Sequence, residues 1–346
     1  MRTSNISTLS VSLALRSATS RMQSDLPRLQ TELVTGKYAD SGLALGAESR
    51  KLISFMGEID HVQQLIDTNE QVMTRLKTSQ EGMSYVRELA DGLVNAVAIV
   101  MGDDNQYPTA QQTAANTVDE ITSVLNTQLN GVFVFAGLNV ETKPVSDYAT
   151  GPGKVAFDAA FLGHFGFNKN DPAANALTAA DIDNFLTTQI EPLFMGAGWT
   201  ASFSSATDEV VTSRISSGVT ADTSVSANEV GFRKLMMASV VATELFDSNL
   251  DSNALVEVSD FVISQAGSAG GDLTKVQGRV GLVENRMTRL NDSLTAQKAL
   301  FQTFASDLQG VDSYQTGIEL NTLLTQIEVS YQITSRIQSL SLMDYV

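Results

Sequence analysis

The feature that most constrains this chain is a pair of long apolar stripes, one in each half of the sequence. In the C-terminal half, apolar residues recur at steps of three and four over 276–311, and only Gln297 breaks the pattern. The N-terminal half carries a matching stripe over 52–76, which resumes after a slip over 86–100. Such spacing is typical of long helices that pack along one another. We therefore predict a mainly α fold, a long antiparallel helical bundle or coiled coil formed by the N- and C-terminal segments.

Ten residues define the seam that we expect to lie inside this bundle. They are Leu52, Phe55, Ile59 and Ile66 in the first half, and Val283, Met287, Leu290, Leu294, Phe301 and Phe304 in the second. Asn69 lies on the same stripe as the first four. An Asn on an apolar seam can fix the register of two helices, and the alternative that Asn69 faces water is equally open.

Residues that break helices concentrate in the middle of the chain. Four of the six prolines lie between 144 and 192, and glycines gather there among Asn, Asp, Thr and Ser. We therefore predict that 141–230 is a small central insert domain, rich in loops and containing short strands. The flanking segments 43–140 and 231–312 are predicted to form the core of the helical bundle.

A short hairpin is predicted near 131–140, just before the insert. Asn130-Gly131 can close the preceding helix by a left-handed C-cap. The β-branched and aromatic run that follows favours a strand, and it includes Phe133 and Phe135 and ends near Gly137.

The two ends of the chain carry further apolar stripes that have no evident cover within one chain. We predict that 1–35 and 318–346 are terminal assembly helices, which stay mobile until other subunits bury them. The residues expected at this interface are Ile6, Leu9, Leu13, Leu29, Leu33, Leu323, Ile327, Ile333, Ile337, Leu340 and Leu342.

Composition disfavours several classes of function. The 346 residues include 22 Lys and Arg against 39 Asp and Glu, a net charge of -17, which repels nucleic acid and anionic membranes. The apolar runs are far shorter than the roughly 18 residues that suggest a spanning helix, so no membrane insertion is expected. With no cysteine, the chain offers neither a disulfide framework nor a thiolate metal site. The N-terminal stretch is amphipathic and does not have the apolar core of a cleaved secretory signal.

No motif predicts catalysis or a cofactor. The only histidines, His61 and His164, are not at metal-ligand spacing. The stretch 247–253 places Asp and Asn at alternate positions, as in a calcium loop, but it lacks that loop's central glycine and closing Glu. Capping of the next helix by Asp251 or Ser252 is the favoured interpretation. We expect no enzyme activity, no cofactor and no metal, with cation binding by this loop left open.

Three segments carry a specific resemblance to a known family. Leu33–Lys37 is similar to a helix-ending L-S-T-G-K string, in which Gly36 would be the helix C-cap. Asn130–Gly137, followed by Thr142–Pro144, looks like G-x-Y-I-F-A-G with a later T-x-P. Ser339–Val346 is close to an L-S-L-x-D-Y-L ending. In this order and placement the segments resemble the bacterial flagellin superfamily, and within it the hook-associated proteins at the hook-filament junction.

The resemblance covers the helical ends and not the middle, and it has two departures. Where relatives read D-D-P-A-G after the first helix, this chain has Ala39–Gly46, and Pro27 lies inside the predicted first helix. The shape of that connection is therefore not given by the family.

The resemblance implies a structural subunit of the bacterial flagellum that connects hook to filament. It implies an extracellular location and export by the flagellar type III apparatus without a cleaved signal peptide. The implied partners are further copies of the chain in a ring or helical assembly, a hook-side junction protein, the filament flagellin and an export chaperone.

Two alternatives differ from the junction protein. The filament flagellin is disfavoured by the F-A-G string at 135–137 and by the absence of the S-S-G-L-R-I-N run of flagellins. A type III secreted translocator or effector is more distant, since a translocator would offer an apolar segment that inserts into membranes.

The inner seam leads to a first testable prediction. Leu294→Asp would place an unpaired charge between the long helices and should lower the free energy of unfolding by roughly 3 kcal/mol. Urea unfolding followed by circular dichroism measures the loss, with Thr295→Asp, one position off the stripe, as control. An unchanged unfolding curve for Leu294→Asp would mean that the seam lies elsewhere.

Overall fold

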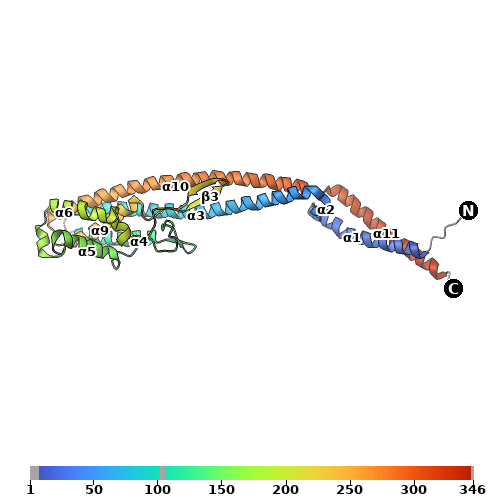
Figure 1. The fold of residues 1–346 in the computed structure, drawn as a ribbon, viewed down its shortest axis with the longest axis horizontal. Coiled ribbons are helices and arrows are strands. Elements are labelled where there is room, and N and C mark those ends of the chain that lie inside the picture. The colour runs from blue at the N-terminus through green and yellow to red at the C-terminus, as the bar shows by residue number, and fades with distance from the viewer. Residues whose placement is uncertain (1–7, 102–105, 344–346) are drawn as a thin grey trace. The chain divides into compact units, whose positions relative to one another are not determined.

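The computed structural model describes the backbone of residues 8–101 and 106–343, and the side chains of 10–101 and 106–336. This part of the chain is mainly helical with two small antiparallel sheets, as the sequence pattern predicted (Figure 1). The helices are α1 (Thr8–Thr35), α2 (Ser41–Leu45), η1 (Gly46–Glu48), α3 (Ser49–Val100), α4 (Tyr107–Leu125), α5 (Pro152–Phe165), η3 (Pro172–Ala176), α6 (Ala179–Phe185), η4 (Leu186–Ile190), α7 (Glu191–Met195), α8 (Gly198–Ser202), α9 (Val230–Leu245), α10 (Ser252–Gln309) and α11 (Ser313–Met343). The strands are β1 (Gln128–Leu129), β2 (Val132–Phe133), β3 (Thr212–Ser216) and β4 (Val219–Asp222).

Contacts divide the chain into two compact units. Unit 1 comprises the described parts of Met1–Gln64 and Ser293–Val346, and unit 2 is the described part of Leu65–Asp292. The long helices α3 and α10 each continue from one unit into the other.

Unit 1 is built from chain segments at opposite ends of the sequence. Helices α1 and α11 lie side by side (Figure 1). The beginning of α3 packs against the end of α10, where the ring of Phe55 lies 6.1 Å from that of Phe301 and 5.5 Å from that of Phe304, between centroids. Such aromatic contacts add to the stability gained by burying apolar area.

The two connections of unit 1, 36–40 and 310–312, are joined by backbone hydrogen bonds. The Tyr38 amide donates to the Gln309 carbonyl at 2.9 Å, and the Val311 amide donates to the Gly36 carbonyl at 3.0 Å. Gly36 has a φ of +67°, and its amide donates to the Glu32 carbonyl at 2.9 Å. Gly36 thus ends α1 in the left-handed conformation expected of a helix C-cap.

Unit 2 has its core around α9, which is buried on nearly all sides. Residues from Phe232 to Leu245 on this helix pack against α4 and contribute to one large apolar cluster. A helix that is apolar all round is stable only inside a protein, so α9 requires cover from every direction.

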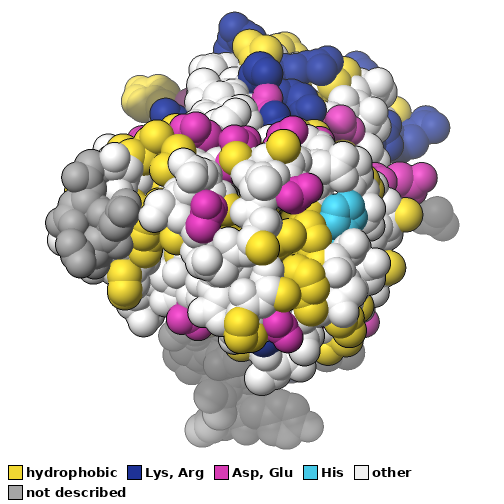
Figure 2. All heavy atoms as spheres, turned by 90° about the vertical axis from the view of Figure 1, so that its left-hand side faces the viewer, with side chains coloured by type: hydrophobic (Ala, Val, Ile, Leu, Met, Phe, Trp, Pro, Cys, Tyr) yellow, Lys and Arg dark blue, Asp and Glu magenta, His cyan; other side chains and the backbone are white. Residues whose placement is uncertain are grey.

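Residues 141–230 contain more helix than their content of breakers suggested. Pro152 and Pro192 lie in the first turns of α5 and α7, where a missing amide proton costs nothing, and Gly166 ends α5 with a φ of +83°. The buried aromatic rings of this segment belong to the same apolar cluster as α9. At the end of unit 2 that carries α5 and α6, Figure 2 shows acidic and hydrophobic side chains interspersed among polar ones.

A hairpin is present at 128–133, ahead of the predicted 131–140, and Asn130-Gly131 has a different role from the one expected. Helix α4 already ends at Leu125, and Asn126 is its C-cap. Asn130 and Gly131 have φ values of +54° and +82° and form the two-residue turn between β1 and β2. Two successive left-handed residues match the twist of a tight hairpin, which explains the Asn-Gly pair.

A buried ionic network ties α9 to the central segment. The carboxylate of Glu244, 4% exposed, accepts hydrogen bonds from Lys154 at 2.9 Å and Tyr148 at 3.0 Å, and a further one from Lys169. Burial by itself would raise the pKa of Glu244, but the two lysines outweigh it and lower the pKa. Burial and the Glu244 charge together raise the pKa of Tyr148.

This network predicts a pH-dependent contribution to stability. Glu244→Gln removes the counter-ion of Lys169 and leaves Lys154 with only Asp158 at 3.7 Å, so it should cost about 2 kcal/mol at neutral pH. Because the folded pKa of Glu244 lies below its ordinary value of 4.5, the stabilisation is complete above that pH and disappears as pH falls through the folded pKa.

Urea unfolding of parent and variant from pH 7 to pH 3 measures this effect. The difference between them should shrink below about pH 4.5, whereas the exposed control Glu70→Gln should differ little from the parent throughout. A constant difference across that range would contradict the assignment.

Candidate assembly surfaces

The paired helices α1 and α11 bury only a narrow strip between them. Leu29 and Glu32 of α1, and Thr316 and Ser330 of α11, are each less than 9% exposed. The Glu32 carboxylate also accepts a hydrogen bond from the Ala39 amide at 3.2 Å and pairs with Arg28. The pair is therefore held by a few mixed apolar and polar contacts.

The predicted terminal interface residues fall into three groups. Leu29 is buried, Leu323 and Ile327 are half-buried, and Leu13, Leu33 and Ile333 are 57%, 37% and 41% exposed. Ile6 lies outside the described residues. Leu9, Ile337, Leu340 and Leu342 lie on α1 and α11, but their side chains are outside the described part.

Sequence reasoning missed several exposed apolar side chains of unit 1. Val34 is 86% exposed, Tyr314 80% and Ile318 50%. These residues lie outside the apolar stripes of the two helices, so the periodicity of the sequence did not mark them as interface residues. Together with Leu13 and Ile333 they add to the exposed apolar side chains on the terminal helices of unit 1.

The residues predicted for the inner seam lie on α3 and α10 and differ in burial. Leu52, Ile66, Met287 and Leu294 are buried, and Phe304 is 41% exposed although its ring contacts Phe55. The remaining members are half-buried: Phe55, Ile59, Val283, Leu290 and Phe301.

Asn69 is fully buried and bridges three elements of unit 2. Its Nδ2 donates to the carbonyl of Ile215 in β3 at 2.9 Å and to Oδ1 of Asn291 in α10 at 2.7 Å. Its own Oδ1 has no hydrogen-bond partner among the described residues. The alternative that Asn69 faces water is therefore wrong, and a buried amide with this geometry favours a single register of α3 against α10.

The hairpin residues lie at a close crossing of backbone segments. Phe135 is fully buried and packs edge-on against Phe232, while Phe133 is half-buried. Gly137 has a φ of +65°, and a Cβ there would lie 2.5 Å from the Thr207 carbonyl oxygen and 2.7 Å from that of Glu209. Only glycine fits both the backbone conformation and the space.

The described residues lack a cluster of metal-ligating side chains. No three His, Asp or Glu side chains among them are grouped to hold a metal ion. Within 247–253, Asp251 caps α10 by accepting from the Ala254 amide at 2.8 Å, and Asn249 donates to the Asn170 carbonyl at 2.7 Å. In the part of the chain that the structure describes, no helix combines the length and the hydropathy of a membrane span.

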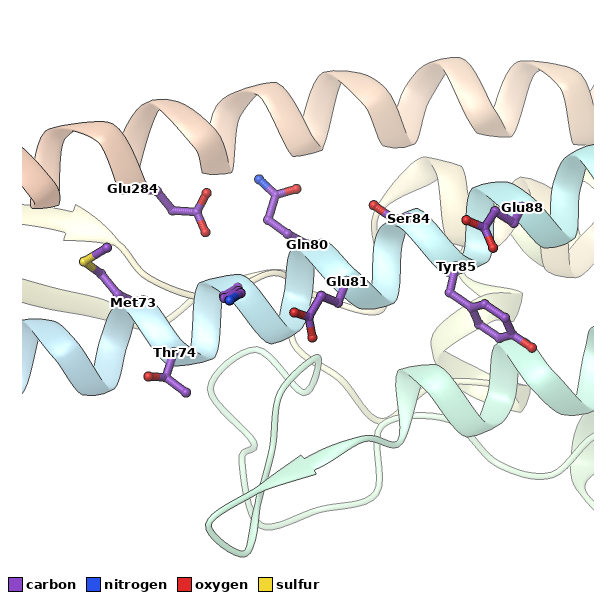
Figure 3. Close-up of a pocket in the computed structure, with 9 residues that line it drawn as sticks. Met73, Thr74, Gln80, Glu81, Ser84, Tyr85, Glu88 and Glu284 are labelled. Atoms are coloured by element: carbon purple, nitrogen blue, oxygen red, sulfur yellow. The ribbon is translucent and has the colours of Figure 1, made fainter.

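A groove of about 840 Å³, lined by acidic side chains together with much apolar surface, lies on the exposed side of α3 in unit 2 (Figure 3). Glu81, Ser84, Tyr85 and Glu88 follow one another along α3, and Glu284 extends from α10 beside Gln80. Sequence reasoning did not find this groove, because it depends on which face of α3 the core leaves open.

Comparison with known proteins identifies the two ends of the chain. Residues 6–140 match the N-terminal helical region of bacterial flagellin, and residues 263–346 match its C-terminal helical region. No curated protein sequence matches the chain.

Two solved structures align with about three quarters of the chain, and the first of them shares its fold. A protein from Vibrio parahaemolyticus, assigned as a flagellar hook-associated protein, is 13% identical with a TM-score of 0.52, over 76% of this chain and 97% of that one. FlgL of Bacillus cereus is 10% identical with a TM-score of 0.43, over 74% of this chain and 98% of that one.

The close crossing at Gly137 leads to a prediction about stability. Gly137→Ala should lower the free energy of unfolding by about 3 kcal/mol, because strain at positive φ adds to a clash with two carbonyl oxygens. Gly131→Ala is the matched control, since its φ is also positive but nothing lies within 4 Å of the added Cβ. It should cost about 1 kcal/mol. If urea unfolding gave the same loss of unfolding free energy for both variants, crowding against residues 207–209 would not explain the effect of Gly137→Ala.

Proposed function

Because the chain belongs to the bacterial flagellin superfamily, we propose that it is a hook-associated structural protein of the flagellum, the adaptor that joins hook to filament. It performs no reaction. Its subunits form a ring or a short helical assembly whose contacts are made by packed helices.

The observation that carries this proposal is the state of the terminal helices. Helices α1 and α11 pair with each other, yet Leu13, Leu33, Val34, Ile318 and Ile333 stay exposed along them. Burying an exposed leucine or isoleucine contributes roughly 1.5–3 kcal/mol, so neighbouring copies that cover these side chains gain a large driving force. Supporting an adaptor role, one neighbour in fold is assigned as a hook-associated protein.

The filament flagellin is the second candidate, since both matched regions are named for flagellin. The F-A-G string, ending in the crowded Gly137, favours the hook-associated proteins over it. The remaining parts of the proposal follow from the junction role. They are export of the unfolded chain by the flagellar type III apparatus without a cleaved signal, an extracellular location, a chaperone on the C-terminal helix, and contacts with a hook-side junction protein and with filament flagellin.

Deletion of the gene separates the two candidates. Loss of a junction adaptor should leave hooks intact while flagellin appears in the medium, because monomers are exported but find no site on which to polymerise. Loss of the filament subunit should remove filaments without released flagellin. Electron microscopy of the cells and immunoblots of the medium distinguish these results.

Truncation after Thr322 tests the terminal helices themselves. It removes much of α11 and should abolish assembly and motility while unit 2 stays folded. Trp199, the only tryptophan of the chain, is buried in unit 2, so its fluorescence reports on that fold. Thr322→Ala in the full-length chain is the control. Normal motility of the truncated protein would mean that the C-terminal helix is not the interface.

A further inference from the structure

The groove on α3 is acidic, and its three carboxylates have no ion-pair partner. Glu81 and Glu88 on α3 and Glu284 on α10 line it, with Lys77 as its cation. None of the three carboxylates forms an ion pair within the described residues. Tyr85, 43% exposed, lies between Glu81 and Glu88, and its hydroxyl donates to Glu120 of α4 at 2.6 Å. The groove thus offers negative charge on both sides of an aromatic ring.

A basic stripe runs along α10 in the same unit. Lys275, Arg279, Leu282, Arg286 and Arg289 follow at steps of four and three, which places them on one helix face. All five are exposed, and Leu282 is 72% exposed in the middle of the stripe. Such a stripe is unusual in a chain with a net charge of -17.

Two members of the stripe have partners within the chain and two do not. Lys275 pairs with Asp272 at 2.8 Å, and Arg279 pairs with Glu229. Arg286 and Arg289 have no ion pair within the described residues. They are therefore available to a partner without breaking an existing ion pair, whereas Arg279 would exchange Glu229 for a carboxylate of the partner.

The groove and the stripe match in spacing and in chemistry. Glu81 and Glu88 are seven residues apart and flank an exposed apolar residue, and so are Arg279 and Arg286. At 1.5 Å per residue both charge pairs span about 10.5 Å, so one can lie over the other. Leu282 would then enter the groove beside Tyr85, which gives the contact an apolar centre and a charged rim.

The two surfaces also face different directions. Glu284, which closes one side of the groove, and Leu282, in the middle of the stripe, are two residues apart on α10 and so lie about half a turn apart around it. The stripe of one molecule therefore cannot bind in the groove of the same molecule. A contact between two different surfaces of identical subunits is heterologous, and it generates a closed ring or an open helical array.

We propose that the acidic groove of α3 receives the basic stripe of α10 from a neighbouring copy of this chain, a lateral contact additional to that of the terminal helices. This inference rests on the proposed function, which requires self-assembly. Charge complementarity sets the orientation and the partner, and it would make the contact weaker at high salt.

Charge reversal tests the pairing. A groove variant, Glu81→Arg with Glu88→Arg, and a stripe variant, Arg279→Glu with Arg286→Glu, should each reduce the number of filaments per cell about tenfold, since like charges then face each other. The chain carrying all four substitutions restores opposite charges and should return to within about twofold of the parent. Co-expression of the two defective variants should also restore assembly, because each supplies the surface that the other needs.

The control for the reversals uses charges elsewhere on the same helices. Glu70→Arg on α3 and Asp260→Arg on α10 change exposed residues outside both surfaces and should leave filament number unchanged. Trp199 fluorescence confirms that every variant folds. If the variant with four substitutions stays as defective as the single-surface variants, or if a different basic protein rescues the groove variant, a second copy is not the occupant.

Disulfide cross-linking locates the contact directly, since the chain has no cysteine of its own. Ser84→Cys with Leu282→Cys should give a ladder of cross-linked subunits in isolated flagella on mild oxidation. Ser84→Cys with Thr288→Cys, which lies off the stripe, should not. Absence of the first ladder overturns the proposal.

The experiments distinguish a wrong lateral contact from a wrong junction role. If gene deletion leaves filaments attached and motility normal, the junction role is wrong whatever the cross-links show. If deletion sheds flagellin but neither charge reversal nor cross-linking has the expected effect, the junction role stands and the lateral contact is wrong.

Discussion

The packing of α3 along α10 is the contact on which the rest of the described structure depends. Each helix depends on burying its apolar face, because tertiary packing supplies most of the stability of helices in proteins. In unit 2 the pair is aligned by polar contacts, since Asn69 donates to Asn291, and Gln80 donates to the Gln277 carbonyl at 2.9 Å. Such directional bonds select one register where apolar contacts alone would tolerate a shift. The same amide of Asn69 holds the carbonyl of Ile215, so the register of the helices also positions the β3–β4 hairpin.

The second organising element is α9, which combines an apolar surface with a single buried charge. Its apolar side chains would accept several rotations about the helix axis, because every side is covered. Glu244 permits fewer rotations of the helix, since its carboxylate must meet Lys154 and Lys169 from the segment that follows the hairpin. The ion pairs therefore add specificity to a core whose stability comes from apolar burial.

The proposed assembly would use two kinds of contact with different physical properties. The exposed leucines, isoleucines and valines of α1 and α11 would contribute non-directional apolar burial, which is strong but poorly selective. The groove and stripe of unit 2 would contribute charge complementarity, which is weaker but selects partner and orientation. A structural subunit that is added one copy at a time benefits from both, because a charged contact guides the approach and an apolar contact retains the subunit.

Periodicity in the sequence was sufficient to predict the helical class and the paired helical ends, because a repeat of three and four residues has one structural solution. Gly36 was likewise predictable as a helix end, since its role depends on residues next to it. Local signals were less decisive at Asn130-Gly131, where the same left-handed residues suit a helix C-cap and a hairpin turn. The early end of α4 at Leu125 decided between them.

Other features were decided only by the tertiary structure. The prolines of 141–230 indicated loops, yet Pro152 and Pro192 begin helices that tertiary packing supports. Glu244 lies in an apolar helix without periodicity, and its lysines are 75 and 90 residues away in sequence. The groove beside Tyr85 also has no signature in the sequence, because a concave surface exists only where the core leaves one face of a helix uncovered. Sequence determines which faces are apolar and where helices end, whereas folding determines which distant charges meet and which faces stay open.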